Sequence, residues 1–153
     1  MNSTKLIPLI TRYSGLISIS LLAYFLLMKL LGFATVVELR FLNFFILLIG
    51  LRYFLLRLKR ENSGTLEYLQ SLAYGFLVSV FASAFFSFFI FFYLSFIDRG
   101  MLEYLQLNQP FGEYLTSASC ALVLILEGCA SGAIISFALV QFMSRESKVK
   151  QAD

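Results

Sequence analysis

The sequence predicts an all-α integral membrane protein, a four-transmembrane-helix bundle in which residues 1–153 form one membrane domain. Three observations lead to this class. Apolar residues make up 59% of the chain and charged residues 14%, whereas soluble domains average about 45–50% and 25%. The mean hydropathy is +0.84. The apolar residues also gather in four long runs, and each run is long enough to cross the roughly 30 Å hydrocarbon layer as a helix.

The predicted spans cover residues 13–31, 36–56, 70–97 and 115–143. The first lies between Arg12 and Lys29, and it continues past Lys29 because a lysine side chain can extend to the headgroups. A cleaved signal peptide is the alternative, but no small-x-small cleavage site follows this run. The second span is the least clean, since Glu38 and Arg40 lie in its first turns and Arg52 lies near its other end.

The third and fourth runs are longer than a bilayer requires. The third is free of charge from Tyr68 to Ile97, and a helix of about thirty residues is about 45 Å long. It must therefore tilt or protrude. The fourth run, from Tyr114 to Ser144, contains one charged residue, Glu127. The connections and the tail are too short to form a second domain.

Basic residues are unevenly divided between the two sides of this arrangement. Nine fall on the side of the two termini and the middle connection: Lys5, Arg12, Arg52, Arg57, Lys59, Arg60, Arg145, Lys148 and Lys150. Three fall on the other side: Lys29, Arg40 and Arg99. By the positive-inside rule we expect both termini in the cytoplasm. The group formed by Arg52, Arg57, Lys59 and Arg60 either determines this topology or binds lipid headgroups or a partner.

Small residues recur at helical spacing in the third and fourth spans. On the third they are Gly75, Ser79, Ser83 and Ser87, and on the fourth Cys120, Gly128, Gly132 and Ser136. Such rows let helix backbones approach closely in lipid, where no hydrophobic effect drives helices together. They predict either packing of these two helices on each other or a homodimer through Gly128 and Gly132. Phenylalanines follow a different side of the third span.

Glu127 is the acidic residue inside the apolar runs that needs an explanation. A carboxylate in the hydrocarbon layer costs several kcal/mol unless it is paired, hydrated or protonated. Arg40 precedes Arg57 by seventeen residues, Lys29 follows Arg12 by seventeen, and Glu127 precedes Arg145 by eighteen. At 1.5 Å per residue each lies about 26 Å from a cytoplasmic anchor. We therefore expect Glu127, Arg40 and Lys29 in one layer, with Glu127 as a structural ion pair, a proton- or ion-coupling carboxylate, or a hydrated side chain.

Several kinds of chemistry are disfavoured by the composition. The chain has no histidine, which is the commonest general base and metal ligand. The two cysteines, Cys120 and Cys129, are nine residues apart and point to opposite sides of one helix, so they cannot bridge each other. The net charge of +3 is small and dispersed, which argues against nucleic acid as a partner. We expect no catalytic residues, no metal, no cofactor and no enzymatic activity.

The order of features resembles a known family. These features are the Arg52-Tyr53 pair that closes the second span, the basic connection with Lys59, Arg60 and Gly64, the third span entered through Gly75, and the fourth span with Glu127, Gly128 and residues 132–136. Over about residues 10–145 the chain is similar to the bacterial membrane family catalogued as domain of unknown function 4199. The resemblance implies a small multi-pass protein of the bacterial inner membrane. It implies no established activity.

Three classes of function remain open after these observations. The first is a structural or accessory membrane subunit whose partners are lipids, a further copy of itself or another membrane protein. The second is a proton- or ion-coupled transporter of small solutes that uses Glu127, by analogy with small multidrug-resistance transporters. The third, a lipid enzyme, is the least favoured, because no cluster of acid, base and nucleophile is present. The environment of Glu127 separates the first two.

Overall fold

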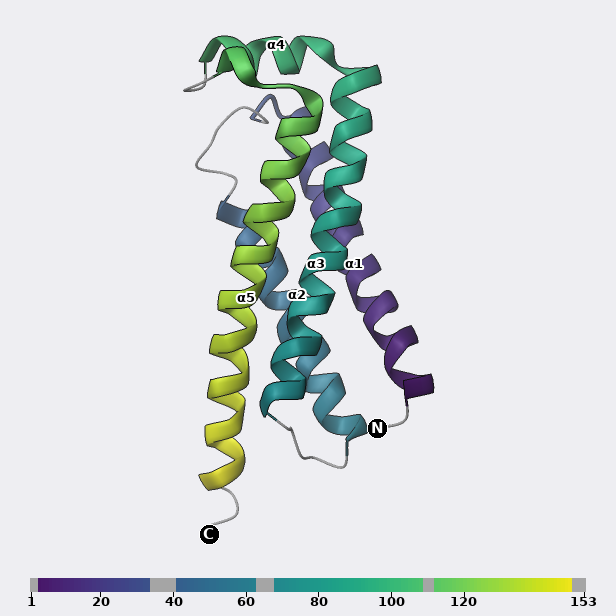
Figure 1. Ribbon diagram of the computed structural model, residues 1–153, viewed down its shortest axis with the longest axis vertical. Helices are drawn as coiled ribbons and strands as arrows, with labels where there is room; N and C mark the ends of the chain where they lie inside the picture. Colours follow the sequence, from purple (N-terminus) through teal and green to yellow (C-terminus); the bar gives the residue numbers. More distant parts are fainter. Residues whose placement is uncertain (1–2, 34–40, 63–67, 109–111, 150–153) are drawn as a thin grey trace.

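The computed structural model describes residues 3–33, 41–62, 68–108 and 112–149, and the side chains of residues 6–144 within these ranges. Throughout this part of the chain the structure is helical, without strands. Four helices are long and apolar enough to cross a membrane (Figure 1). They are α1 (Ser3–Leu30), α2 (Phe41–Glu61), α3 (Tyr68–Phe92) and α5 (Ser117–Val149). The predicted class is confirmed to this extent.

The helices extend beyond some of the predicted spans. The first begins at Ser3, ten residues before the predicted start, and α2 continues five residues past position 56, to Glu61. Of the predicted second span, residues 36–40 lie outside the described residues. These differences have one physical reason. Apolar composition marks the part of a helix that suits lipid, whereas backbone hydrogen bonds continue the same helix into polar sequence.

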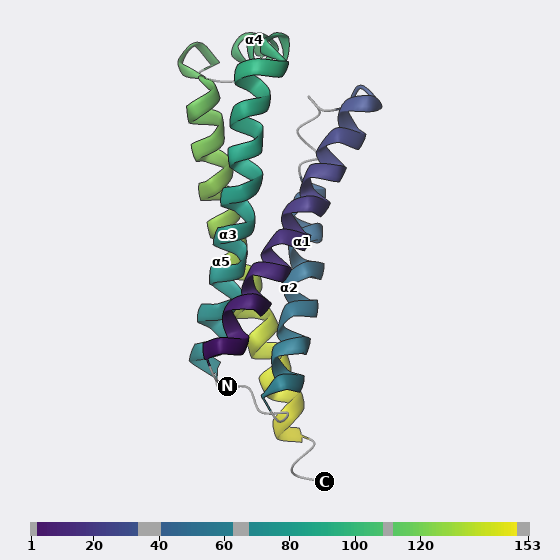
Figure 2. The ribbon, with the colours of Figure 1, turned by 90° about the vertical axis from the view of Figure 1, so that its right-hand side faces the viewer.

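The four long helices run alternately up and down. α1 begins and α5 ends at one end of the bundle, called here the terminal end, while α4 (Arg99–Asn108) lies across the opposite end, called here the α4 end (Figures 1 and 2). α3 is the central element, because it packs most extensively on α5 and next on α1, while α2 contacts α1, α3 and α5.

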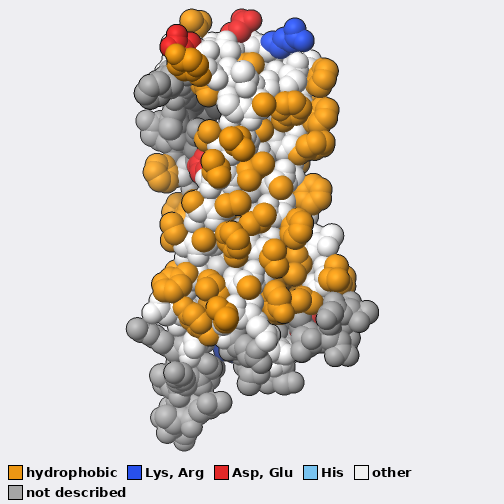
Figure 3. Space-filling view, in the orientation of Figure 1, with side chains coloured by type: hydrophobic (Ala, Val, Ile, Leu, Met, Phe, Trp, Pro, Cys, Tyr) orange, Lys and Arg blue, Asp and Glu red, His pale blue; other side chains and the backbone are white. Residues whose placement is uncertain are grey.

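Buried apolar side chains come from all four long helices. Fully enclosed ones include Leu51, Phe54, Leu55, Val78, Ala82 and Val140. The outer surface is apolar as well, and hydrophobic side chains cover the visible face along most of its length (Figure 3). Exposed aromatics of α3 include Phe81, Phe85, Phe88 and Phe92, and Phe96, just beyond the end of α3, is exposed as well. A helix that is apolar on every side suits a lipid environment.

The connection after α3 has more structure than the sequence predicts. A π-helix, η2 (Tyr93–Ile97), prolongs α3, and α4 and a 3-10 turn, η3 (Gly112–Tyr114), follow it. Asp98 separates η2 from α4, and its Oδ1 accepts a hydrogen bond of 3.0 Å from the Met101 backbone N–H. This is an N-cap interaction, which satisfies a helix donor that would otherwise lack a partner. Asp98 thus ends one helix and begins another at the edge of the bundle.

Candidate functional site

The most extensive helix contact, between α3 and α5, is lined by small residues of both helices. Three glycine–serine pairs face each other across it: Gly128 with Ser83, Gly132 with Ser79, and Gly75 with Ser136. A Cβ placed on Gly128 or Gly132 would overlap the side chain of its serine, and one on Gly75 would lie 2.7 Å from Ser136 Oγ. The two backbones therefore approach closely because each glycine leaves room for the opposite side chain. We call this contact the α3–α5 seam.

Serine hydroxyls supply polar contacts inside the bundle. Ser87 Oγ donates to the Ala121 carbonyl across the α3–α5 seam. Ser18 Oγ on α1 lies 3.0 Å from the Ala82 carbonyl of α3 and 2.8 Å from the Ser14 carbonyl of its own helix. All buried polar side chains in the described part of the chain are serines. Such hydrogen bonds between helices are one of the interactions that hold helices together in lipid.

One close helix contact was not singled out from the sequence. A Cβ on Gly50 of α2 would meet the Ile17 side chain of α1, with 2.7 Å to its Cδ1. Gly50 stands in the apolar core of the second span, but it has no small residue four positions away that would form a row. A single glycine carries little signal in sequence. Ser18, whose hydroxyl joins α1 to α3, follows Ser14 by one turn, and this pair of serines spaced by four residues is a signal that the sequence contains.

Lys29 has a different partner from the predicted one. Its ammonium group forms an ion pair with Asp98 and donates a hydrogen bond to the Tyr93 hydroxyl, at the α4 end of the bundle. The ammonium also lies 4.4 Å from the centroid of the Tyr93 ring, within the range of a cation–π interaction. This cluster of Lys29, Tyr93 and Asp98 joins the end of α1 to the end of α3.

The predicted layer of three charged residues is therefore corrected for Lys29. Glu127 is the eleventh residue of α5, so it lies about 15 Å along the helix from the first residue of α5, whereas Lys29 lies in the last turn of α1. Counting residues from the cytoplasmic anchors did not allow for the different lengths and tilts of the helices. Arg40, the third member, lies outside the described residues. Glu127 itself is exposed on the surface of α5.

Two donors lower the pKa of the Asp98 carboxyl below its ordinary value of 3.8. The larger effect is the hydrogen bond from Lys29, the next is the hydrogen bond from the Met101 backbone N–H, and partial burial opposes both. These two hydrogen bonds therefore favour the ionised form of Asp98. A signal for this pair exists in the sequence, because Lys29 ends the first apolar run and Asp98 directly follows the third, at the same end of an alternating bundle.

The basic group at the terminal end lies on the last three turns of α2. Arg57 Nε donates to Glu61 Oε1 at 2.9 Å, one turn further along the helix. Arg52 and Arg60 are exposed and Lys59 is half-buried. Of these four side chains, only Arg57 lines the pocket between α1 and α2.

Both cysteines belong to α5, both are half-buried, and neither forms a disulfide. Within the residues that the structure describes, no group of three or more Cys, Asp or Glu side chains is arranged to hold a metal ion. The described geometry thus consists of a tightly packed helix seam, a charged cluster at one end and a basic pocket at the other.

Comparisons with known proteins identify the family of this chain. No curated protein and no solved structure matches the chain. A family described as "Protein of unknown function (DUF4199)" matches residues 12–145, which include all but the first turns of α1 and the last turn of α5. The family predicted from the sequence is thereby confirmed. This chain of four apolar helices belongs to the DUF4199 family.

Proposed function

We propose that this protein is an accessory subunit of the bacterial cytoplasmic membrane: a packed four-helix unit that binds lipids and other membrane proteins and is not itself a catalyst. In the proposed orientation the terminal end of the bundle is cytoplasmic. The uneven division of basic residues supports this orientation.

The observation that carries the proposal is the nature of the bundle interior. Apolar side chains and serines fill it, and none of the charged side chains that the structure describes is buried. A solute-coupling carboxylate is expected inside the bundle or in a water-filled cavity. Glu127 instead lies on the surface of α5. The outward-facing apolar side chains, in contrast, suit contact with lipids and with other apolar helices.

The test compares the wild type with Glu127→Gln and uses two measurements. The first is proton flux into vesicles that contain the purified protein and a panel of small cationic solutes. The second is the melting temperature in detergent at two pH values on either side of neutrality. For an accessory subunit we expect no proton flux above that of protein-free vesicles. Of the two measured quantities, Glu127→Gln should alter only the melting temperature.

A second arm examines assembly. Membranes of cells that express the chain at its native level are extracted into polymer-bounded nanodiscs, and the size of the particles that contain the chain is measured. We expect the chain in particles that contain a stoichiometric second protein or further copies of the chain. A solute-dependent flux in the wild type that Glu127→Gln abolishes, with the melting temperature unchanged, would contradict the accessory role and establish the transporter alternative.

A further inference from the structure

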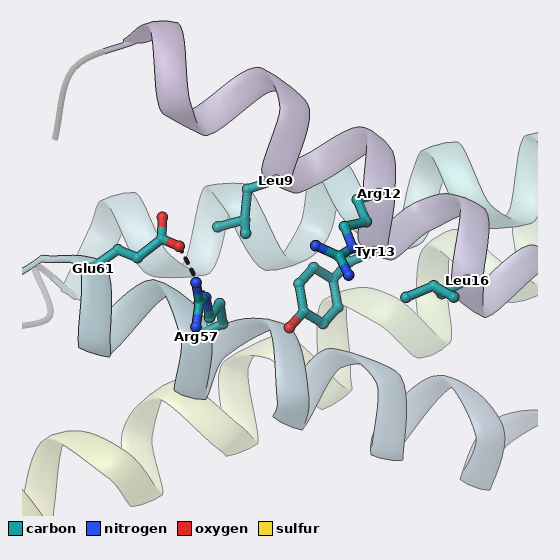
Figure 4. A pocket seen from close by; sticks show the side chains of 6 residues that line it. All are labelled: Leu9, Arg12, Tyr13, Leu16, Arg57 and Glu61. Atoms are coloured by element: carbon teal, nitrogen blue, oxygen red, sulfur yellow. Dashed lines mark hydrogen bonds and ion pairs between the residues drawn. The ribbon is translucent and has the colours of Figure 1, made fainter.

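A pocket of about 270 Å³ opens between α1 and α2 near the terminal end of the bundle (Figure 4). Its lining comes from both helices: Leu9, Arg12, Tyr13 and Leu16 of α1, and Arg57 and Glu61 of α2. In the close-up Arg12 and Tyr13 extend from α1 into the space between the two helices, and on α2 Arg57 is paired with Glu61. The residues that line this pocket belong neither to the α3–α5 seam nor to the cluster of Lys29, Tyr93 and Asp98.

Helical spacing explains why these side chains share one place. On α1 the positions i, i+3, i+4 and i+7 form a single stripe, and these four positions are occupied by Leu9, Arg12, Tyr13 and Leu16. On α2 Arg57 and Glu61 are one turn apart and also share a face. The Tyr13 ring packs edge to face on Phe54 with centroids 5.7 Å apart, so the phenol is held at the pocket wall.

The charges of the lining favour an anion. Two guanidinium groups face one carboxylate, and that carboxylate is already bonded to Arg57 through Nε. Arg12 has no ion-pair or hydrogen-bond partner among the residues that the structure describes, and its side chain is exposed. Guanidinium groups match the geometry of a phosphate, to which they can donate two parallel hydrogen bonds.

The position of the pocket along α1 fits a membrane boundary. Arg12 and Lys29 are separated by seventeen residues of α1, which is about 26 Å along the helix and close to the ~30 Å hydrocarbon thickness. If Lys29 marks one boundary of the apolar layer, Arg12 marks the other. Leu16 lies one turn from Arg12 toward the middle of the layer, and it is 52% exposed. The two guanidinium groups of the pocket thus adjoin a surface that suits an acyl chain.

We propose that this pocket is a binding site for an anionic phospholipid, whose headgroup phosphate lies between Arg12 and Arg57 and whose acyl chain follows Leu16. Tyr13 offers a phenolic hydroxyl to the same headgroup. This inference rests on the lipid-binding part of the proposed function and names the lipid class and its site. The flux and assembly measurements do not depend on this pocket, so failure of the lipid site and failure of the accessory role are distinguishable.

The test uses the full chain in a nonionic detergent, titrated with phosphatidylglycerol or phosphatidylcholine. Bound lipid is counted by native mass spectrometry, and the lipid-dependent rise in melting temperature is recorded in parallel. For Arg12→Gln and for Arg57→Gln we expect the affinity for phosphatidylglycerol to fall about tenfold, the loss that follows from removing a charge-assisted hydrogen bond. Affinity for phosphatidylcholine should be lower than for phosphatidylglycerol in the wild type.

Arg60→Gln is the matched control, because it removes the same charge from the same end of α2 at an exposed position outside the pocket lining. We expect it to retain wild-type affinity. An equal loss in Arg60→Gln would show that diffuse surface charge attracts the lipid, and this would overturn the pocket. Protection by inorganic phosphate alone at the same concentration would overturn the lipid as occupant in favour of a free anion.

A measurement on the wild type covers the case in which Arg12→Gln does not fold. A photoreactive phosphatidylglycerol is crosslinked to the chain in vesicles, and the labelled peptides are mapped. We expect label in residues 9–16 and 53–61. Label spread evenly over all four long helices would overturn the site.

Discussion

Asp98 makes two different interactions with one carboxylate. Oδ1 accepts from the Met101 backbone N–H and starts α4, while Oδ2 pairs with Lys29 of α1. A single side chain therefore positions the surface helix and joins α1 to the end of α3. The side chains of both partners remain partly exposed, at 34% for Lys29 and 25% for Asp98, so solvent screens the ion pair and its contribution to stability is modest.

Asp98→Asn should separate these two roles. Asparagine is as good an N-cap as aspartate, so the α4 start is retained while the charge is lost. We expect destabilisation by about 1 kcal/mol at neutral pH, the upper end for a partly exposed pair, measured as the melting temperature in detergent. Glu103→Gln, which removes an exposed carboxylate from the neighbouring helix α4, is the control and should leave the melting temperature unchanged.

The Lys29–Asp98 ion pair also predicts how the stability of the fold depends on pH. Because the pKa of Asp98 is lower in the folded protein than its ordinary value of 3.8, the ion pair stabilises the fold fully above that value. The stabilisation is lost as the pH falls below 3.8 and through the folded-state pKa. The stability difference between wild type and Asp98→Asn should therefore shrink in that acidic range. A difference that stays constant down to pH values below the folded-state pKa would contradict the ion pair.

Among the elements, α3 combines two opposite kinds of surface. One side presents glycine and serines to α5, and another presents large exposed aromatics such as Phe85 and Phe88. The small side allows close backbone approach, and the aromatic side suits lipid. The sequence rows of small residues indicate this division, but only the packed helices show which glycine faces which serine.

Gly132→Leu tests the α3–α5 seam. The new side chain would overlap Ser79, and we expect destabilisation of about 1–3 kcal/mol, typical of overpacking, measured by thermal unfolding in detergent. Gly15→Ala is the matched control, because a Cβ there would meet nothing within 4 Å. It should leave stability unchanged or raise it by up to about 1 kcal/mol through helix propensity.

An exchange across the seam strengthens this test. Gly132→Ser alone should lower the melting temperature. The double variant Gly132→Ser, Ser79→Gly places the serine on α5 and the glycine on α3, and it should recover part of the lost stability. If Gly132→Leu unfolds at the wild-type temperature, the seam does not hold the two helices together as described here.

For the whole molecule, the alternating helices predict that the two ends of the bundle lie on opposite sides of the membrane. In a variant with Cys120 and Cys129 replaced by serine, single cysteines introduced at Gly64 and Asn108 should react differently with an impermeant maleimide. We expect Asn108→Cys to react in intact spheroplasts and Gly64→Cys only after permeabilisation, because the basic residues favour a cytoplasmic terminal end. Labelling of both positions from one side would show that the number of spans is wrong.

The sequence by itself determined the class, the four apolar helices and the family, because apolar run length and residue order are properties of each helix taken alone. It also indicated which helix faces are small. Only the tertiary structure decided that Lys29 meets Asp98, that Gly50 meets Ile17, that α4 crosses the end of the bundle, and that Arg12 and Arg57 line one pocket. These pairings depend on the tilt and rotation of whole helices, which packing between neighbouring helices sets and no local pattern specifies.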